Sequence, residues 1–231
     1  MQYNGGKAAV AKEIAEIIAE CSYGSTYWEP FVGAANVICR PELAHFTRYG
    51  SDLDPHIIML LNAIKGGWVP PSEVSEEDYA KAKADTEPSA LRGFIGYGCS
   101  FGGKFFGGYA RSGNRNYAAN AANSAIKQAP LLRRVSLLTS TYEAMPFGKV
   151  DTIYCDPPYK GTTRCGSSDD FNSDSFFEWC IERVKRGCTV FVSEFSAPPE
   201  FKELWRKELK DGLRKAGGKH SMTERLFVCQ P

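Results

Sequence analysis

Val150-Asp151-Thr152-Ile153-Tyr154-Cys155-Asp156-Pro157-Pro158-Tyr159 is the stretch that says most about this chain. Its apolar first part, residues 150–155, predicts a buried strand. Pro157 and Pro158 then fix two φ angles and remove two backbone N–H donors, so they form a stiff turn. Ligands bind beyond the carboxyl ends of the strands in open α/β sheets. We therefore expect the carboxylate of Asp156 and the ring of Tyr159 to be presented to a ligand.

The groups at this corner suit a planar amine. The carboxylate of Asp156 and the free backbone carbonyls accept hydrogen bonds, and Tyr159 offers an aromatic face. The exocyclic amino group of a nucleobase has N–H donors, and the base itself has a π-face for stacking. The tetrapeptide therefore indicates chemistry on a base. Taken alone, it also fits a purely structural corner between a strand and a loop.

The rest of the chain alternates helix and strand patterns, which predicts an α/β fold. Before residue 65, the predicted elements are a helix over 8–19, a strand over 27–31, a small-residue turn over 32–37 that leads into a helix toward Cys39 or Arg40, a strand over 45–50 and a helix over 56–64. After residue 128, they are strands over 135–138 and 150–155, a helix over 175–185, and strands over 188–193 and 225–229.

The segment 65–128 has a different character and is predicted to be an insertion between two parts of one core, 1–64 and 129–231. It contains Pro70-Pro71, then charged residues, then a part rich in glycine and aromatic residues. Basic and aromatic side chains alternate in its second half, a mixture that suits a DNA-facing surface. The candidate phosphate contacts there are Lys104, Arg111 and Arg115.

Composition narrows the class of protein. The chain has 231 residues, enough for one α/β domain with an insertion. Its 28 basic and 27 acidic residues give a net charge of +1, which neither requires nor excludes nucleic acid, because phosphate binding depends on a local basic face. No signal peptide and no apolar run of about 18 residues is present, so we expect a cytoplasmic protein, in a bacterium or a phage-infected cell, without a membrane partner.

The eight cysteines are scattered, and none forms a C-x-x-C pair. This pattern favours neither a zinc ribbon nor a thioredoxin-like motif, and we expect no metal. Most of the cysteines are predicted to be small core residues. They are Cys21, Cys39, Cys99, Cys155, Cys165, Cys180, Cys188 and Cys229.

A second group of residues suits a nucleoside cofactor. The small-residue turn after the first strand lets a ligand approach the backbone, and it lacks the G-x-G-x-x-G pattern of pyrophosphate-binding turns. Asp52, at the end of the second strand, stands where an acid can accept hydrogen bonds from a ribose. Lys7 follows Gly5-Gly6 and is a candidate clamp for a ligand carboxylate. Taken singly, these are also an ordinary turn, a capping aspartate and a solvated lysine.

Together, these residues resemble the Dam-type DNA adenine N6-methyltransferases, in particular the compact phage-type branch. The resemblance extends from Tyr3 to Phe227. It rests on four motifs in the family's order, which are Tyr3-Asn4-Gly5-Gly6-Lys7, Glu29-Pro30-Phe31-Val32-Gly33-Ala34, Ser51-Asp52-Leu53-Asp54 and Asp156-Pro157-Pro158-Tyr159. Weaker echoes are Phe101-Gly102-Gly103-Lys104-Phe105, Val192-Ser193-Glu194-Phe195 and Glu224-Arg225-Leu226-Phe227.

The resemblance implies a Rossmann-like methyltransferase sheet with helices on both faces, and a target-recognition region within 65–128. It implies that S-adenosylmethionine lies against one set of residues, with Asp52 at the ribose. These are Tyr3, Lys7, Glu29, Phe31, Gly33, Asp52 and Asp156. By the same resemblance, Asp156 and the carbonyl of Pro157 hold the N6 amine of a flipped adenine, and Tyr159 stacks on its ring.

Two departures from the family pattern bear on affinity. Thr141 stands where relatives often have an acidic residue, and Ala35-Asn36 stands where many have Gly-Ala or Gly-Gly. The function expected from the resemblance is methyl transfer to adenine N6 in double-stranded DNA, with protection of phage DNA from restriction or an orphan role as its purpose. The alternatives are transfer to cytosine N4 or to an RNA adenine, and a catalytically silent nucleic-acid-binding module.

Overall fold

The computed structural model describes residues 3–111, 113–144, 150–159, 171–210 and 221–231. Its strands are β1 Thr26–Glu29, β2 Thr47–Asp52, β3 Val135–Thr139, β4 Thr152–Cys155, β5 Thr189–Ser193, β6 Lys202–Lys210 and β7 Ser221–Cys229. Its α-helices are α1 Ala11–Cys21, α2 Pro55–Lys65, α3 Glu76–Ala84, α4 Ala90–Gly93, α5 Tyr117–Leu132 and α6 Ser173–Lys185. Shorter helical turns are η1 Pro41–Leu43, η2 Phe94–Gly98 and η3 Phe101–Gly103.

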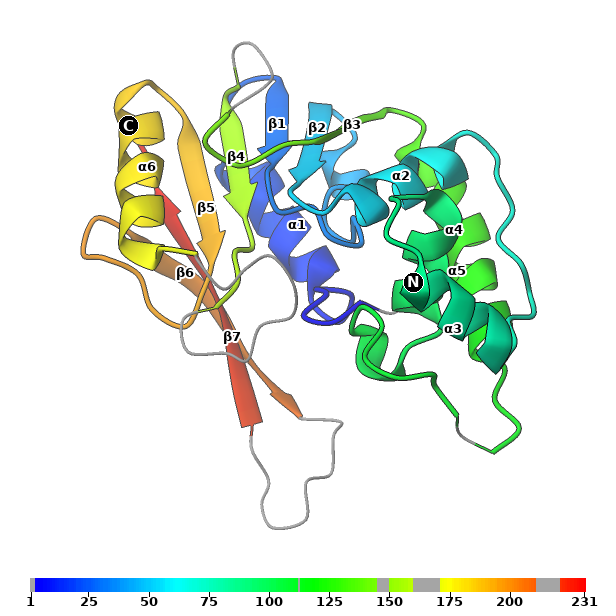
Figure 1. Ribbon diagram of the computed structural model, residues 1–231. Coiled ribbons are helices and arrows are strands. Elements are labelled where there is room, and N and C mark those ends of the chain that lie inside the picture. Colours follow the sequence, from blue (N-terminus) through cyan, green and yellow to red (C-terminus); the bar gives the residue numbers. More distant parts are fainter. Residues whose placement is uncertain (1–2, 112, 145–149, 160–170, 211–220) are drawn as a thin grey trace.

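The strands form one sheet with the order β3-β2-β1-β4-β5-β7-β6 (Figure 1). The pairs β3-β2, β2-β1, β1-β4 and β4-β5 are parallel, whereas β7 runs antiparallel to both β5 and β6. This order and this reversed strand confirm the predicted α/β fold with a Rossmann-like sheet.

Both faces of the sheet are covered, as predicted. On β1, Tyr27 lies in a hydrophobic cluster with Ile14 and Ile18 of α1, whereas its neighbour Trp28 lies in a second cluster with Phe176 of α6. Successive residues of a strand point to opposite faces. The helices α1 and α6 therefore cover opposite faces, and the central strands are buried on both.

Asp151 fastens the beginning of β4 to the beginning of β1. Its Oδ2 accepts hydrogen bonds from Ser25 N at 2.9 Å and from Thr26 N and Oγ1 at 3.2 and 2.8 Å. In return, the Thr26 hydroxyl accepts a hydrogen bond from Asp151 N. Gly24 has a φ of +98°, and a Cβ there would lie 2.5 Å from the Asp151 side chain, so this close approach requires glycine. These contacts fix the relative position of the two central strands.

The segment 65–128 is largely helical and packs on the core. Its helix α4 contacts α2, and Phe94 and Ala121 belong to the same hydrophobic cluster as α1. The helix α5 continues across the predicted boundary at 128/129, and Gln128 Nε2 donates to Ala34 O at 2.7 Å. The proposed role of 65–128 in target recognition stays a prediction.

The predicted helix after the turn at 32–37 is wrong. Ala35 N donates to Val32 O and Arg40 N donates to Val37 O, so the backbone forms two separate four-residue turns. Arg40 is extended, with a ψ of 139°, because the following Pro41 disfavours a helical conformation at the residue before it. The chain then makes the single turn η1.

The sequence analysis did not predict β6. Its residues Lys-Glu-Leu-Trp-Arg-Lys-Glu-Leu-Lys are strong helix formers, yet they pair with β7 at the edge of the sheet. Trp205 and Leu209 pack against the hydrophobic core, and charged side chains fill the exposed face. Long-range pairing with β7 therefore outweighs the local helix propensity.

The prediction for the cysteines is confirmed for the five that are buried, Cys39, Cys99, Cys155, Cys180 and Cys188. Cys21 and Cys229 are half-buried, and Cys165 lies outside the described residues. In the part of the chain that the structure describes, no helix is both long enough and apolar enough to cross a bilayer.

The contacts of Asp151 predict a loss of stability on truncation. Asp151→Ala removes the acceptor of two backbone N–H groups, and a hydrogen bond to a charged group contributes about 1.5–3 kcal/mol. Because these groups are exposed or only partly buried, water replaces part of the loss, and we expect the free energy of unfolding to fall by about 2–3 kcal/mol in all. Urea denaturation followed by circular dichroism measures this. The exposed Glu20→Ala is the control, and an equal effect of both substitutions would contradict the role of Asp151.

Candidate active site

The candidate site lies where the strand order of the sheet reverses. From β1 the chain proceeds to β2 and β3 on one side, and from β4 to β5 on the other. The strands β1 and β4 are paired through Tyr27 with Thr152 and Trp28 with Ile153. The loops that leave the two strands therefore diverge to opposite faces, and such a reversal is where open α/β sheets bind ligands. Asp156 begins the loop after β4.

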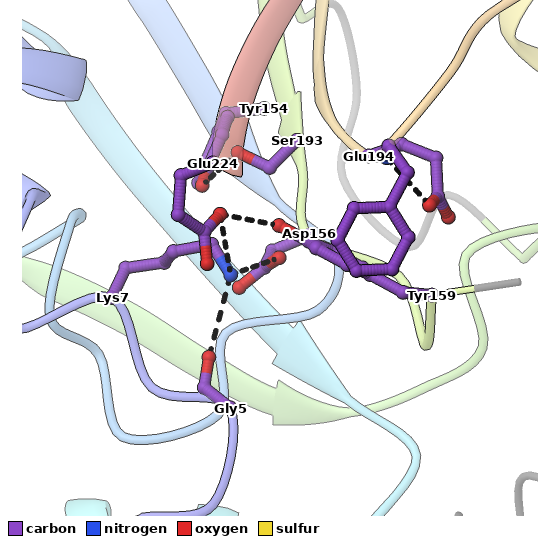
Figure 2. Close-up of polar contacts among 9 residues, drawn as sticks. Gly5, Lys7, Tyr154, Asp156, Tyr159, Ser193, Glu194 and Glu224 are labelled. Carbon is purple, nitrogen blue, oxygen red and sulfur yellow. Dashed lines mark hydrogen bonds and ion pairs between the residues drawn. The ribbon is translucent and has the colours of Figure 1, made fainter. Parts of the chain in front are cut away.

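A compact polar cluster occupies this edge (Figure 2). Lys7 Nζ lies 2.8 Å from Asp156 Oδ1 and 3.6 Å from Glu224 Oε2. Tyr159 OH donates to the same Glu224 oxygen at 2.8 Å. Lys7 Nζ also donates to Gly5 O at 3.4 Å and lies 4.7 Å from the centre of the Tyr159 ring. The cluster thus joins three distant parts of the chain, the amino terminus, the corner after β4 and the strand β7.

Burial and charge together set the protonation of this cluster. Burial alone would lower the pKa of the Lys7 ammonium, but Asp156 and Glu224 more than offset it and raise that pKa. Burial raises the pKa of Asp156, and Lys7 opposes the shift. Burial is the main cause that raises the pKa of the Tyr159 hydroxyl. The hydroxyl therefore stays protonated and donates a hydrogen bond to Glu224. Lys7 therefore stays positively charged beside two carboxyl groups.

The turn after β1 lies against Asp52 and Tyr3. Gly33 has a φ of +44°, and a Cβ there would lie 2.9 Å from Tyr3 Cε1, so the position requires glycine. Gly33 N donates to Asp52 Oδ2 at 2.9 Å, and Asp54 N donates to Asp52 Oδ1 at 3.0 Å. The backbone of Leu53 also bonds to this carboxylate, so about one of its four acceptor positions is left for a further donor. Burial raises the pKa of Asp52 to about 6 in spite of these bonds.

Glu29 and Phe31 flank the same turn but face different surroundings. Glu29 is buried, accepts a hydrogen bond from Tyr27 OH at 2.9 Å and is also hydrogen-bonded by the backbone of Ile38. Burial raises its pKa strongly. Phe31 is half-buried, and its ring stacks on that of Tyr142 with 5.5 Å between centroids. Glu29 thus contacts the turn from its buried side, and Phe31 packs on its more exposed side.

The structure adds residues to which the sequence analysis gave no role. Tyr97 donates from its hydroxyl to Asp54, and its ring lies 4.9 Å from that of Tyr3, so it fixes the ring against Gly33. Tyr142 extends the aromatic surface of Phe31. Glu224 is 4 % exposed. The weak family motif that contains it, Glu224-Arg225-Leu226-Phe227, was the available signal for Glu224.

The three predicted DNA contacts are exposed on the helical segment. Lys104 lies in the loop after η3, Arg111 is paired with Glu76, and the guanidinium of Arg115 lies 5.4 Å from the centre of the Tyr117 ring. An exposed ion pair such as that of Arg111 is weak and can open in favour of a phosphate. Their contact with DNA stays a prediction.

No protein-family model matches the sequence, and no curated protein matches it either. Several solved structures resemble its chain path. The precorrin-6y C5,15-methyltransferase of Geobacter metallireducens is 9% identical with a TM-score of 0.40, and the match covers 95% of this chain and 87% of that one. For the C-terminal domain of precorrin-6Y C5,15-methyltransferase from Rhodobacter capsulatus, the identity is 10%, the TM-score 0.39 and the coverage 100% of both chains.

The N-terminal domain of human METTL16, in complex with SAH, is 9% identical with a TM-score of 0.40, and the match covers 94% of this chain and 67% of that one. At such scores these similarities carry no argument about the reaction of this chain. Its own residues have to supply that argument.

The pKa of Asp52 predicts a pH dependence of stability. An unfolded aspartate releases its proton near its ordinary pKa of 3.8, whereas the folded one holds it until about 6. Between these values the folded state binds more protons, so this residue's contribution to stability falls as pH rises from about 4 to about 6. Asn resembles the protonated acid, so Asp52→Asn is expected to gain stability relative to the unsubstituted protein over that interval.

Urea denaturation of both proteins at several pH values between 4 and 7 measures this difference, and the exposed Asp85→Asn serves as the control. A constant difference between the Asp52→Asn variant and the unsubstituted protein would show that Asp52 titrates alike in the folded and unfolded chains.

Proposed function

We propose that this chain is an S-adenosylmethionine-dependent methyltransferase that acts on N6 of adenine in double-stranded DNA. The observation that carries the proposal is the position of Asp156-Pro157-Pro158-Tyr159, which begins at the carboxyl end of β4, at the reversal of strand order, close to the turn after β1. A carboxylate, a proline-fixed carbonyl and an aromatic ring at that place suit an amine on a planar base.

The residues around the turn fit the cofactor. Asp52 offers acceptor capacity for a ribose hydroxyl at the end of β2, and the glycine at Gly33 lets the Tyr3 ring lie directly against the turn. Phe31 offers an aromatic face beside the same turn. Tyr3, Lys7, Glu29 and Asp156 complete the residues that would hold or border it. When bound, S-adenosylmethionine supplies a methyl group activated by its positively charged sulfur.

The chain's own groups prepare the amine for attack. In the proposed mechanism, the Asp156 carboxylate and the Pro157 carbonyl accept hydrogen bonds from the two N6 hydrogens. These bonds concentrate electron density on a nitrogen whose lone pair is otherwise delocalised into the ring. As the nitrogen gains positive charge, the carboxylate attracts it more strongly, which is the selective stabilisation of the transition state that catalysis requires. After the methyl group is transferred, the positively charged nitrogen gives one proton to the Asp156 carboxylate that holds it, and the carboxylate passes that proton to water.

The adenine has to leave the double helix to reach this corner. Unstacking costs a few kcal/mol, and stacking on Tyr159 together with phosphate contacts offsets this cost. The rings of Tyr159 and Phe195 pack edge to face, with 4.8 Å between centroids and an interplanar angle of 81°. Phe195 therefore supports the ring on which the base would stack. Lys104, Arg111 and Arg115 are the proposed phosphate contacts.

Incubation with tritiated S-adenosylmethionine tests the proposal. The purified protein is given DNA or RNA, and the labelled nucleosides are separated. We expect label in N6-methyladenine from DNA. Label in N4-methylcytosine would show that the substrate is cytosine, and label only in RNA would show that it is RNA. Binding of the cofactor and DNA without any label would indicate a silent binding module.

Asp156→Ala is expected to lower the rate of methyl transfer by about 100-fold or more, because it removes a preorganised acceptor that acts in the transition state. Binding of S-adenosylmethionine, measured by calorimetry, should change far less. The exposed Asp85→Ala is the matched control. An alanine variant at position 156 that transfers methyl groups at the unsubstituted rate would refute the role given to Asp156.

A further inference from the structure

The strand β7 reaches past the strands beside which it lies. It pairs with β5 only from Leu226 to Cys229, opposite Ser193 to Val190. Its earlier residues pair with β6 alone, in a hairpin that extends beyond the carboxyl ends of β4 and β5 (Figure 1). Because β7 runs antiparallel to β5, this extension passes over the edge of the sheet where the site lies.

Glu224 is the residue that this extension brings to the site. It shares one face of β7 with Leu226 and Val228, which belong to the same hydrophobic cluster as α1. On this face of β7, Glu224 therefore follows a row of apolar side chains. It lies next to Lys7, in the segment before α1. An unpaired carboxylate would be costly here, because Glu224 is 4 % exposed. Its contacts with Lys7 and Tyr159 offset that cost.

Lys7 and the base amine would compete for Asp156. Its Oδ1 atom lies 2.8 Å from the Lys7 ammonium, which itself carries N–H donors. A base amine that enters the corner would have to share or replace that contact. Lys7 cannot simply withdraw, because it is only 7 % exposed and a buried ammonium without a partner is strongly disfavoured. Glu224 Oε2, at 3.6 Å from Lys7 Nζ, is a second anionic partner already in place.

We propose that Glu224 is a positioning residue for methyl transfer, which takes over the Lys7 ammonium and holds the Tyr159 hydroxyl so that Asp156 is released to the target amine. This inference rests on the proposed function. Glu224 touches neither the base nor the cofactor, and it acts through Lys7 and Tyr159. With Glu224, two acidic groups lie beside the single ammonium of Lys7. This excess of negative charge favours an amine that gains positive charge.

Three substitutions separate the parts of this role. Glu224→Gln keeps the size and an acceptor for Tyr159 but removes the charge that holds Lys7. Glu224→Asp keeps the charge at a shorter reach, and Tyr159→Phe removes only the hydroxyl. Glu208→Gln is the matched control, because Glu208 is exposed on β6 of the same hairpin. Thermal unfolding and the Kd for S-adenosylmethionine, measured for each variant, detect a merely structural defect.

We expect Glu224→Gln to lower kcat on DNA by about 10-fold or more, the effect of one lost contact with a charged group, with little change in KM. Glu224→Asp should recover part of the rate. Glu224→Gln should still lower kcat in the Tyr159→Phe background, because the Lys7 contact is independent of that hydroxyl. Glu208→Gln should match the unsubstituted protein.

A second readout needs no turnover. In ligand-free protein with ¹³C-labelled lysine, the Lys7 signal is identified by its loss in Lys7→Arg, and its titration reports the pKa of the ammonium. Glu224, Asp156 and the Tyr159 ring face that ammonium. We expect Glu224→Gln to lower the pKa, since one of the two carboxylates that raise it is removed.

An active unsubstituted protein with an equally active Glu224→Gln variant, or an unchanged Lys7 titration in that variant, would overturn this inference alone. An unsubstituted protein that transfers no methyl group to DNA or RNA would overturn the proposed function and the inference together. The unsubstituted protein therefore distinguishes the two failures.

Discussion

The pairing of β1 with β4 is the constraint on which the site depends. Asp151 fastens the beginnings of the two strands, and their carboxyl ends then lie side by side at the reversal of strand order. The turn with Gly33 leaves one strand, and the corner with Asp156 leaves the other. Neither loop contains the whole site. The turn proposed for the cofactor and the corner proposed for the amine become neighbours only because the sheet places their strands together.

The proposed chemistry of the site depends on buried charged groups. Lys7 is almost fully covered and has to be paired, and its partner is Asp156, the carboxylate to which we assign the reaction. In the proposed reaction, Lys7 therefore competes with the substrate amine for Asp156. Glu224 of β7 would then take over the Lys7 ammonium, so that no charge is left unpaired. The long hairpin at the sheet edge thus has a consequence for the reaction as well as for packing.

Much of the fold was predictable because its central elements have local signals. The helical spacing of Ile57, Leu60, Leu61 and Ile64 and the apolar strands around residues 135–138, 150–155 and 188–193 are confirmed. The strand β6 was not predicted because it forms by pairing with β7. Its own lysines and glutamates show no local strand pattern. The helix toward Arg40 was wrong because a single proline outweighed helix-compatible neighbours.

The site was predictable in its parts but not in its contacts. The sequence singled out Lys7 and Asp156 separately, and only the folded chain pairs them. Glu224 was noticed within a short motif, but its role depends on how far β7 extends past β5, a matter of register that one sequence does not specify. Residue type therefore picked out the candidate residues, whereas the contacts between them required the three-dimensional arrangement.

The structure of the protein with S-adenosylhomocysteine and an adenine-containing oligonucleotide tests the central claim most directly. The account predicts an adenine whose N6 hydrogen-bonds to Asp156 and to the Pro157 carbonyl, with its ring on Tyr159 and with Lys7 turned to Glu224. A cofactor bound at another edge of the sheet, or a base held elsewhere while Asp156 stays paired with Lys7, would contradict it.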